Sequence, residues 1–392
     1  MRLHQLADLL PALPWFLPFL TLPRLARRNP NLSDASPADG ELVSIIVPAR
    51  NEAGNIEKLI RSIQASTYRP LELIVVDDRS TDATAAQVNA MGSDRQLQLI
   101  RGGDLPEGWF GKPWACFQGY QAARGTLLLF TDADTRHSPE LLGRAVGALL
   151  AERADLVTIA PRQRCVTFWE RIVMPQIWFL LALRYSPVSV NRARRPRDVI
   201  ANGQFILTTR RAYEAAGTHE AVRDEVAEDL ALAQTYLQRG SKLHFAFAER
   251  LMETRMYCGL RHLVEGWSKN VYLGGRRSFP DEPIRRALVP IMLIIALSYW
   301  LVPPIVLLAN LSGHGLGSLG MPMAIATAAS AVFWTLICIG MKIPPFYGLG
   351  YPLGSVIGLY IALRSTWRGA RKVEWRGRVY SNSGKAGQRG SG

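Results

Sequence analysis

The segment Leu127-Leu128-Leu129-Phe130-Thr131-Asp132-Ala133-Asp134 carries the most information about this chain. Its leading apolar residues predict a buried strand, and two carboxylates follow at the strand's end, where an α/β sheet presents its chemistry. Because side chains alternate along an extended segment, we expect Asp132 and Asp134 to point to the same side. Two hard oxygen ligands suit Mg²⁺ or Mn²⁺, an ion that shares its coordination shell with substrate phosphates. The alternative interpretation is a solvated turn with two surface aspartates.

The surrounding residues place this segment in an α/β domain over residues 41–275. Short apolar runs there alternate with helical patterns, and strands are predicted at 44–47, 71–76, 97–100, 126–130, 155–160 and 204–208. Such alternation predicts a mainly parallel sheet with helices on both faces and ligands at the carboxyl ends of its strands. The chain has no Walker motif and no strand-linked Gly-x-Gly-x-x-Gly, which disfavours P-loop NTPases and Rossmann dehydrogenases.

The composition narrows the classes of partner. The chain has 392 residues, 48% of them hydrophobic, and a formal net charge of +14, which predicts anionic partners. Much of the basic charge lies beside apolar stretches and does not interleave with aromatic residues, so we expect a membrane and no nucleic acid as a partner. The four cysteines show no Cys-x-x-Cys spacing and are interpreted as thiols in a reducing compartment.

Both ends of the chain are predicted to contact a membrane. Residues 1–28 hold an apolar run followed by Arg24, which indicates a short span or an interfacial helix. Residues 285–364 hold three apolar stretches, at 287–310, 319–341 and 346–363, which are interpreted as membrane helices, with buried helices of a soluble core as the alternative. Residues 365–392 are expected to form a basic, partly disordered tail.

Two further features bear on how the chain meets the membrane. Residues 172–190 are apolar with a basic end, which predicts an interfacial helix within the α/β domain or, alternatively, a core helix. Arg285 precedes the first C-terminal stretch and Arg364 follows the last, and the positive-inside rule places both in the cytoplasm. Three crossings cannot satisfy this, so one stretch is expected to be re-entrant or interfacial. The predicted location is the inner (cytoplasmic) membrane, with the α/β domain facing the cytoplasm.

Four ordered blocks resemble those of the family 2 glycosyltransferases, which use the nucleotide-sugar fold called GT-A. The blocks are Val47-Pro48-Ala49-Arg50-Asn51-Glu52, Val76-Asp77-Asp78-Arg79-Ser80-Thr81-Asp82, Asp132-Ala133-Asp134 and Val226-Ala227-Glu228-Asp229-Leu230. The resemblance covers roughly residues 42–275 and is greatest to bacterial enzymes that glycosylate carotenoids, hopanoids or other lipids. It implies a GT-A domain that takes a UDP-sugar or another nucleoside-diphosphate sugar as donor and a lipid as acceptor.

The resemblance also implies a role for each block. Asp229 is the expected general base, with Glu228 beside it, and Asp134, helped by Asp132, is expected to hold Mg²⁺ or Mn²⁺ at the donor diphosphate. The expected nucleotide-sugar contacts are Pro48, Arg50, Glu52, Asp77, Asp78, Lys112, Asp132, Asn202, Gly203 and Trp267. Lys112 lies in a Gly-Lys-x-x-Ala segment, and Asn202-Gly203 resembles the loop that shapes the sugar pocket.

Structural roles remain open for several of these residues. Asp77 and Asp78 fit an Asx-turn that caps a helix, and Glu228-Asp229 fits an acidic pair favoured at a helix N-terminus. Lys112 fits a surface lysine. His219, ahead of the last block, fits a loop histidine as well as a residue lining the acceptor pocket.

One block departs from the pattern of the processive members. Those enzymes carry Gln-x-x-Arg-Trp near the membrane, whereas residues 264–270 here contain Trp267 without the Gln and Arg in register. This departure favours the inverting transfer of a single sugar to a lipid hydroxyl. A processive polysaccharide synthase and a polyprenyl-phosphate sugar synthase remain alternatives, and the Glu228-Asp229 block argues against the second. A channel or transporter is disfavoured because the two longest apolar stretches carry no charge.

Overall fold

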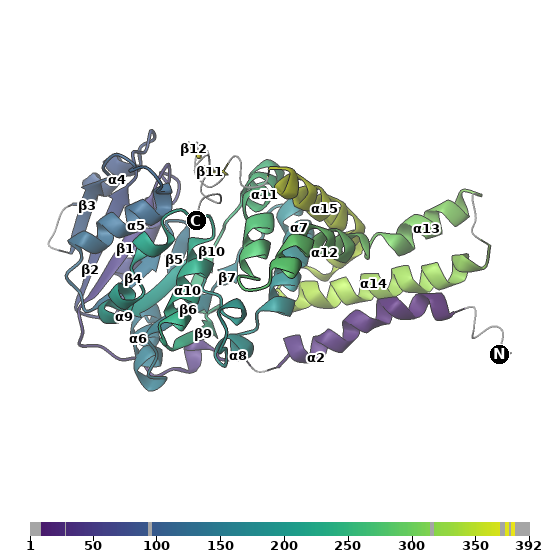
Figure 1. The fold of residues 1–392 in the computed structure, drawn as a ribbon, viewed down its shortest axis with the longest axis horizontal. Helices are drawn as coiled ribbons and strands as arrows, with labels where there is room; N and C mark the ends of the chain where they lie inside the picture. The colour runs from purple at the N-terminus through teal and green to yellow at the C-terminus, as the bar shows by residue number, and fades with distance from the viewer. Residues whose placement is uncertain are drawn as a thin grey trace, which may run out of the picture.

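An α/β domain lies at one end of the molecule and a set of long helices projects from it (Figure 1). The computed structural model describes residues 9–27, 29–92, 96–313, 317–368, 373–375 and 378–380. The predictions for residues 1–8 and for most of the tail therefore lie outside the described residues.

The α/β domain is built on a seven-stranded sheet in the order β3-β2-β1-β4-β8-β6-β9. The strands are β1 (Val43–Ala49), β2 (Leu71–Asp77), β3 (Leu97–Arg101), β4 (Leu127–Thr131), β6 (Leu156–Ala160), β8 (Phe205–Thr209) and β9 (Leu243–Phe247). β8 pairs antiparallel with β4 and β6, and the other pairs are parallel. Every residue of β1 and β2 is buried, as expected for central strands covered on both faces. The predicted mainly parallel sheet is confirmed.

Helices cover both faces of this sheet. Ile45 of β1 belongs to one core cluster, together with residues of α3 (Ile56–Gln64) and α6 (Leu141–Ala151). Its neighbour Ile46 belongs to a second cluster, together with residues of α5, α9 and α10. The second group of helices spans Gly111–Ala122 (α5), Arg210–Ala215 (α9) and Glu228–Gln238 (α10). The alternation of β1 side chains therefore divides the domain into three layers.

The strand that was expected to carry Asp132 and Asp134 ends before them. β4 ends at Thr131, and a turn follows before the short strand β5 (Thr135–His137) begins. The turn is fixed by hydrogen bonds: the Thr135 hydroxyl donates to the Asp132 carbonyl at 2.8 Å, and the Thr254 hydroxyl donates to the Asp134 carbonyl at 3.3 Å. Thr254 belongs to β10 (Met252–Thr254), which pairs with β5 and with β7 (Arg162–Gln163) in a small second sheet. The positions of the two carboxylates are therefore set by this turn.

The N-terminal apolar run forms a 3₁₀ helix, η1 (Leu10–Thr21), which continues into α2 (Leu22–Leu25). Prolines at positions 11, 14 and 18 remove backbone donors, which is consistent with the absence of a regular α-helical hydrogen-bond pattern. η1 packs along α14 (Gly320–Gly340), and the Trp15 indole donates to the Tyr299 carbonyl at 3.0 Å.

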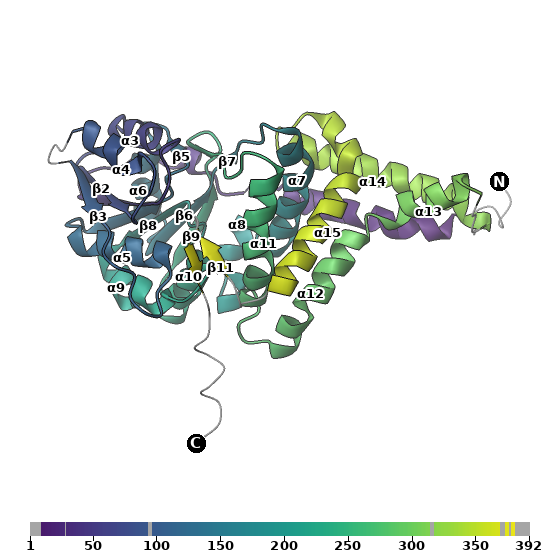
Figure 2. The same cartoon turned by 90° about the horizontal axis from the view of Figure 1, so that it is seen from above.

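The C-terminal apolar stretches form α12 (Pro283–Ser298), α13 (Val302–Leu311), η5 (Gly317–Leu319), α14, η6 (Pro345–Gly350) and α15 (Tyr351–Arg368). By length and composition, Gly320–Gly340 and Pro345–Arg368 are each able to cross a membrane, and α12 and α13 together form a candidate span bent by 47°. In both views α13, α14 and the N-terminal helix project away from the α/β domain (Figures 1 and 2).

The stretch predicted as an interfacial helix at 172–190 forms α7 (Phe168–Arg184) and the short α8 (Pro187–Val190). Ile172, Val173 and Met174 of α7 are buried in a cluster with residues of α11 (Leu260–Arg277) and α15. α7 thus packs largely as the core-helix alternative describes. Of the tail, β11 (Val373–Trp375) and β12 (Arg378–Tyr380) pair antiparallel.

Candidate functional site

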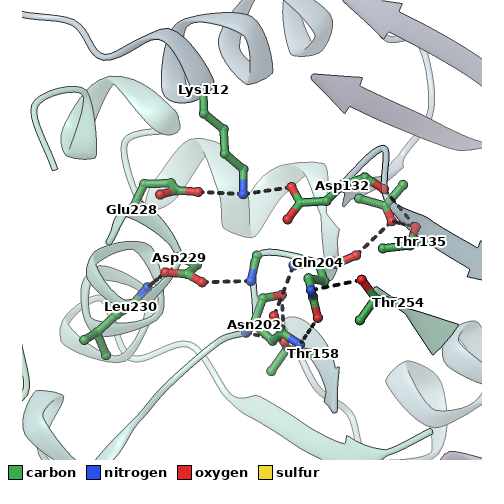
Figure 3. A network of polar contacts seen from close by, with 12 residues as sticks. Lys112, Asp132, Thr135, Thr158, Asn202, Gln204, Glu228, Asp229, Leu230 and Thr254 are labelled. Atoms are coloured by element: carbon green, nitrogen blue, oxygen red, sulfur yellow. Dashed lines mark hydrogen bonds and ion pairs between the residues drawn. The ribbon is translucent and has the colours of Figure 1, made fainter. Parts of the chain in front are cut away.

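Lys112 joins two blocks that are far apart in the sequence. Its Nζ atom lies 2.8 Å from Oδ1 of Asp132, which follows β4, and 2.9 Å from Oε1 of Glu228, the first residue of α10 (Figure 3). The three side chains are only 11–28% exposed. A lysine between two carboxylates in such a place is a charge-assisted bridge, and it is not the solvated surface lysine of the alternative interpretation.

The first turn of α5 is held in place by its neighbours. The Phe110 N–H donates to the Arg223 carbonyl at 2.7 Å, which ties the start of α5 to the end of the 3₁₀ helix η4 (His219–Val222). Trp109 packs against Trp114 with ring centroids 5.1 Å apart. These contacts fix the backbone from which Lys112 reaches the carboxylates.

Asp229 is held by two backbone donors. Its Oδ2 accepts from the Gly203 N–H at 2.9 Å, and its Oδ1 accepts from the Leu230 N–H at 2.7 Å. Burial and the neighbouring Glu228 carboxylate raise the pKa of Asp229 to about 6. Burial opposes ionisation of Glu228 too, but the Lys112 ammonium lowers the pKa of Glu228 overall. Two adjacent carboxyl groups with opposite pKa shifts are a typical acid–base arrangement.

The loop before β8 approaches the carboxylates through its backbone. A Cβ atom on Gly203 would lie 3.0 Å from Lys112 Nζ and 3.1 Å from Asp229 Oδ2, so a larger side chain there would crowd both. Asn202 fixes the loop, because its N–H donates to the Thr158 hydroxyl at 2.8 Å and its amide donates to the Ile159 carbonyl at 3.0 Å. Asn202 therefore acts on the site by holding Gly203.

The residues after β1 and β2 form a neighbouring polar cluster. Arg50 donates to the Asp78 carbonyl at 2.6 Å, and the Glu52 N–H donates to the Thr84 hydroxyl at 2.8 Å. Asp77 accepts from Arg101 at 2.9 Å and from the Ser80 N–H at 3.3 Å. The second contact is the kind of turn that the structural alternative describes, so the geometry leaves room for both roles. Pro48 lies closer to the bridge, in the wall of a small cavity shared with Lys112 and Asp229.

The structure does not bring Trp267 to these residues. Its indole is 8% exposed, lies in the apolar cluster between α7 and α11, and donates to the Met174 sulfur at 3.3 Å. The face of α11 that carries Trp267 is turned toward α7, and we therefore leave Trp267 out of the proposed site.

The donor set suits a cation that is shared with a phosphate ligand. Among the described residues no group of three or more His, Cys, Asp or Glu side chains is placed to hold a metal ion. Mg²⁺ and Mn²⁺ in nucleotide sites need only one or two protein carboxylates, because phosphate and water supply the remaining oxygens. Asp132 and Asp134 in the turn after β4 fit this requirement, and Lys112 supplies positive charge at Asp132 in the structure as it stands.

Sequence reasoning did not commit to three polar residues that the structure places at the cavity. Cys116, His219 and Thr131 line it together with Lys112 and Glu228. Cys116 lies one helical turn after Lys112, so the period of α5 predicts that they share a face. His219 carries no local signal of its position, because η4 is brought to α5 only by tertiary packing.

Known glycosyltransferases resemble this chain in sequence and in fold. Residues 44–216 match the family model described as Glycosyl transferase family 2. The 4,4'-diaponeurosporenoate glycosyltransferase of Staphylococcus aureus (strain MRSA252) is 26% identical over an alignment of 359 residues that covers 87% of this chain and 88% of that protein. The solved structure of the mannosyltransferase PcManGT from Pyrobaculum calidifontis, in complex with GDP-Man and Mn²⁺, superposes with a TM-score of 0.55 at 20% identity and covers 92% of this chain and 96% of that one.

Proposed function

We propose that this chain, which carries a family 2 glycosyltransferase domain with the GT-A fold, transfers one sugar with inversion from a nucleoside-diphosphate sugar to a hydroxyl group of a lipid. The observation that carries this proposal is the pair of ion pairs by which Lys112 links the expected donor site to the carboxylate next to the expected base. Lys112 contacts both Asp132, at the expected diphosphate position, and Glu228, which adjoins the half-buried carboxyl of Asp229.

The reaction is a single displacement. The acceptor oxygen forms a bond to the anomeric carbon, the bond from that carbon to the diphosphate oxygen breaks, and Asp229 takes the hydroxyl proton. Two backbone N–H groups hold Asp229 in one orientation, which prepares its carboxylate for this step. Its raised pKa makes it a stronger base than an ordinary aspartate.

Negative charge on the leaving nucleoside diphosphate is balanced at Asp132 and Asp134, on the side of Lys112 that faces away from Glu228. A bound Mg²⁺ or Mn²⁺, held by Asp134 and Asp132, would neutralise the diphosphate as a Lewis acid. Lys112 adds a fixed positive charge to this region and keeps Glu228 ionised. An ionised Glu228 in turn disfavours the ionised form of Asp229 and so strengthens it as a base.

The projecting helices support a lipid as acceptor and the membrane as location. Exposed apolar side chains line η1, α13 and α14, among them Leu10, Leu13, Leu17, Ile305, Leu308, Leu311, Met321, Val332 and Ile339. Apolar surface of this extent suits a bilayer. The relative from Staphylococcus aureus is named for a carotenoid acid, which is consistent with an acceptor dissolved in lipid.

Two related activities are distinguished by their products. A polyprenyl-phosphate sugar synthase would use a phosphate as acceptor, would need no general base, and would release its sugar in mild acid. A processive polysaccharide synthase would make products of many sugar units. A product with one sugar that is stable to mild acid supports the proposal over both.

The first experiment measures donor turnover by the full-length protein in lipid. A panel of nucleotide sugars is tested with and without Mn²⁺ or Mg²⁺, in the presence of an extract of bacterial membrane lipids. We expect one donor to release its nucleoside diphosphate in a metal-dependent way. The variant Asp134→Asn should lose this turnover, whereas Asp104→Asn, at a position 94% exposed, should retain it. Metal-independent turnover, or equal loss in both variants, would contradict the proposed donor site.

A further inference from the structure

His219 presents one edge of its ring to the cavity beside the catalytic carboxylates. The side chain is 3% exposed and lies on η4, between Phe130 of β4 and Tyr213 of α9. The cavity measures about 10 Å³ and is lined by His219, Lys112, Glu228 and Asp229, among others. This volume admits one water molecule.

The hydrogen bonds of Tyr213 determine the tautomer of His219. The Tyr213 hydroxyl oxygen accepts from the His219 main-chain N–H at 3.0 Å and lies 2.7 Å from the ring Nδ1. If Nδ1 carried a proton, the buried Tyr213 hydroxyl proton would have no acceptor among the described residues, which is unfavourable. The hydroxyl therefore donates to Nδ1. Burial lowers the pKa of His219 to about 3, so the ring is neutral and its single proton is on Nε2.

The backbone directly before His219 is strained. Thr218 has φ 59° and ψ −166°, a conformation that is essentially restricted to glycine. The Thr218 hydroxyl accepts from the Glu220 N–H at 3.1 Å and starts η4 directly at His219. Non-glycine residues in this region persist only where surrounding structure enforces them, and they gather at functional sites.

We propose that His219 is a positioning residue of the acid–base pair, and that its Nε2–H donates to the Glu228 carboxylate through one water molecule held in the cavity. This inference rests on the proposed function, because Glu228 and Asp229 are assigned there. The Tyr213 hydroxyl fixes the tautomer, His219 orients the water, and the water with Lys112 keeps Glu228 ionised and in place. The relay moves no proton; it holds the charge that makes Asp229 a strong base.

Three substitutions separate this role from simple packing. His219→Phe keeps an aromatic ring against Phe130 but removes both nitrogen atoms, and we expect kcat to fall about tenfold or more with KM for the donor within about twofold. His219→Gln places an amide N–H near the position of Nε2 and should recover most of this loss. His244→Phe, at another buried histidine in β9, controls for loss of a buried imidazole and should leave kcat unchanged. Thermal unfolding of each variant checks that it is folded.

Nitrogen NMR on histidine-labelled protein tests the proposal without turnover. We expect the His219 signals, assigned by their loss in His219→Gln, to show a protonated Nε2 and a bare Nδ1 at pH 7. Tyr213→Phe should alter the Nδ1 signal, and Glu228→Gln should alter the Nε2 signal.

The proposal is overturned if Nδ1 carries the proton, if Glu228→Gln leaves Nε2 unchanged, or if His219→Gln is no better than His219→Phe. Absence of turnover with every donor would instead contradict the proposed function, because the NMR result stands apart from catalysis.

Discussion

At the scale of single residues, the chemistry of the site depends on the different pKa values of two neighbouring carboxyl groups, Glu228 and Asp229. The two carboxyls are adjacent in sequence, yet only Glu228 contacts the Lys112 ammonium, and its pKa is lowered while that of Asp229 is raised. A pair of groups whose pKa values are pushed apart marks the acid–base assignment. We therefore expect the residue-level experiments to separate these two neighbours clearly.

The raised pKa of Asp229 determines the pH dependence that we expect for the reaction. Only its ionised form accepts a proton, so kcat/KM should fall about tenfold for each pH unit below about 6 and level off above it. Asp229→Asn should lower kcat by about a hundredfold or more while donor binding, measured by calorimetry, persists. Asp224→Asn, a nearby acidic position outside α10, serves as the control. Full turnover in Asp229→Asn would remove Asp229 from the role of base.

The ion pairs of Lys112 lead us to expect that the stability of the fold depends on cation binding. Lys112→Met leaves the Asp132 and Glu228 carboxylates without their cation, and because these groups are partly exposed we expect a loss of about 1–3 kcal/mol in the free energy of unfolding. Mn²⁺ should restore part of the thermal unfolding midpoint, since a ligand that binds the folded state stabilises it. Lys242→Met, at a lysine 53% exposed and paired with Glu152, should change little. Equal midpoints for the two variants would contradict a structural role for the bridge.

At the scale of elements, α15 packs against helices of the catalytic part of the chain. A Cβ atom on Gly354 would lie 2.5 Å from the Ile172 carbonyl oxygen of α7, and the Ser355 hydroxyl donates to the Gln176 side chain at 2.9 Å. Further along, Arg364 and Arg368 each form an ion pair with Glu265 of α11. The glycine-rich stretch is thus a close-packed helix contact, which a small residue at every fourth position permits.

The close packing of Gly354 against α7 leads us to expect that this glycine does not tolerate a larger side chain. Gly354→Leu forces α15 away from the α7 backbone and should lower the thermal unfolding midpoint in detergent, at a cost of about 1–3 kcal/mol. Gly340→Leu at the end of α14, where no atom lies within 4 Å of the added Cβ, should leave the midpoint nearly unchanged. Similar midpoints for both variants would show that α15 does not depend on this contact.

At the scale of the whole molecule, the described basic residues near the helices gather at the end next to the α/β domain. Lys342, at the end of α14, contacts Glu249 of that domain, and Arg364 and Arg368 contact α11. The end of α13 and the start of α14 lie at the opposite tip, beside the start of η1 (Figures 1 and 2). α14 has 21 residues and so a length of about 30 Å, which matches the apolar thickness of a bilayer.

This arrangement predicts three crossings, by η1, by α12 with α13, and by α14, with α15 on the cytoplasmic side. Because only two of these crossings lie between Arg285 and Arg364, such a topology places both residues in the cytoplasm, as the positive-inside rule requires. In intact cells a membrane-impermeant maleimide should label Ser318→Cys, at the tip, in a Cys258→Ser background. The exposed native Cys258 should react only after lysis. Protection of the tip cysteine in intact cells, or labelling of Cys258, would contradict the orientation.

The sequence by itself determined the strands, the order of the polar blocks and the family resemblance. Buried strands are apolar runs, and the carboxyl ends of parallel strands meet at one edge of a sheet, so local pattern suffices to place residues such as Pro48, Asp77 and Asp132 near each other. The apolar helices also follow from local composition, since length and hydropathy are properties of a segment.

Only the tertiary structure decided how these parts act together. Lys112 meets Glu228 across more than a hundred residues, and the raised pKa of Asp229 arises from burial and a neighbouring charge, neither of which a local pattern encodes. The same holds for Trp267, which α11 turns into an apolar core, for the turn that ends β4 before Asp132, and for α15, whose Gly354 packs against the backbone of α7. Periodicity fixes which face of an element is apolar, whereas packing between elements fixes what that face meets, and desolvation at the contact then sets the chemistry.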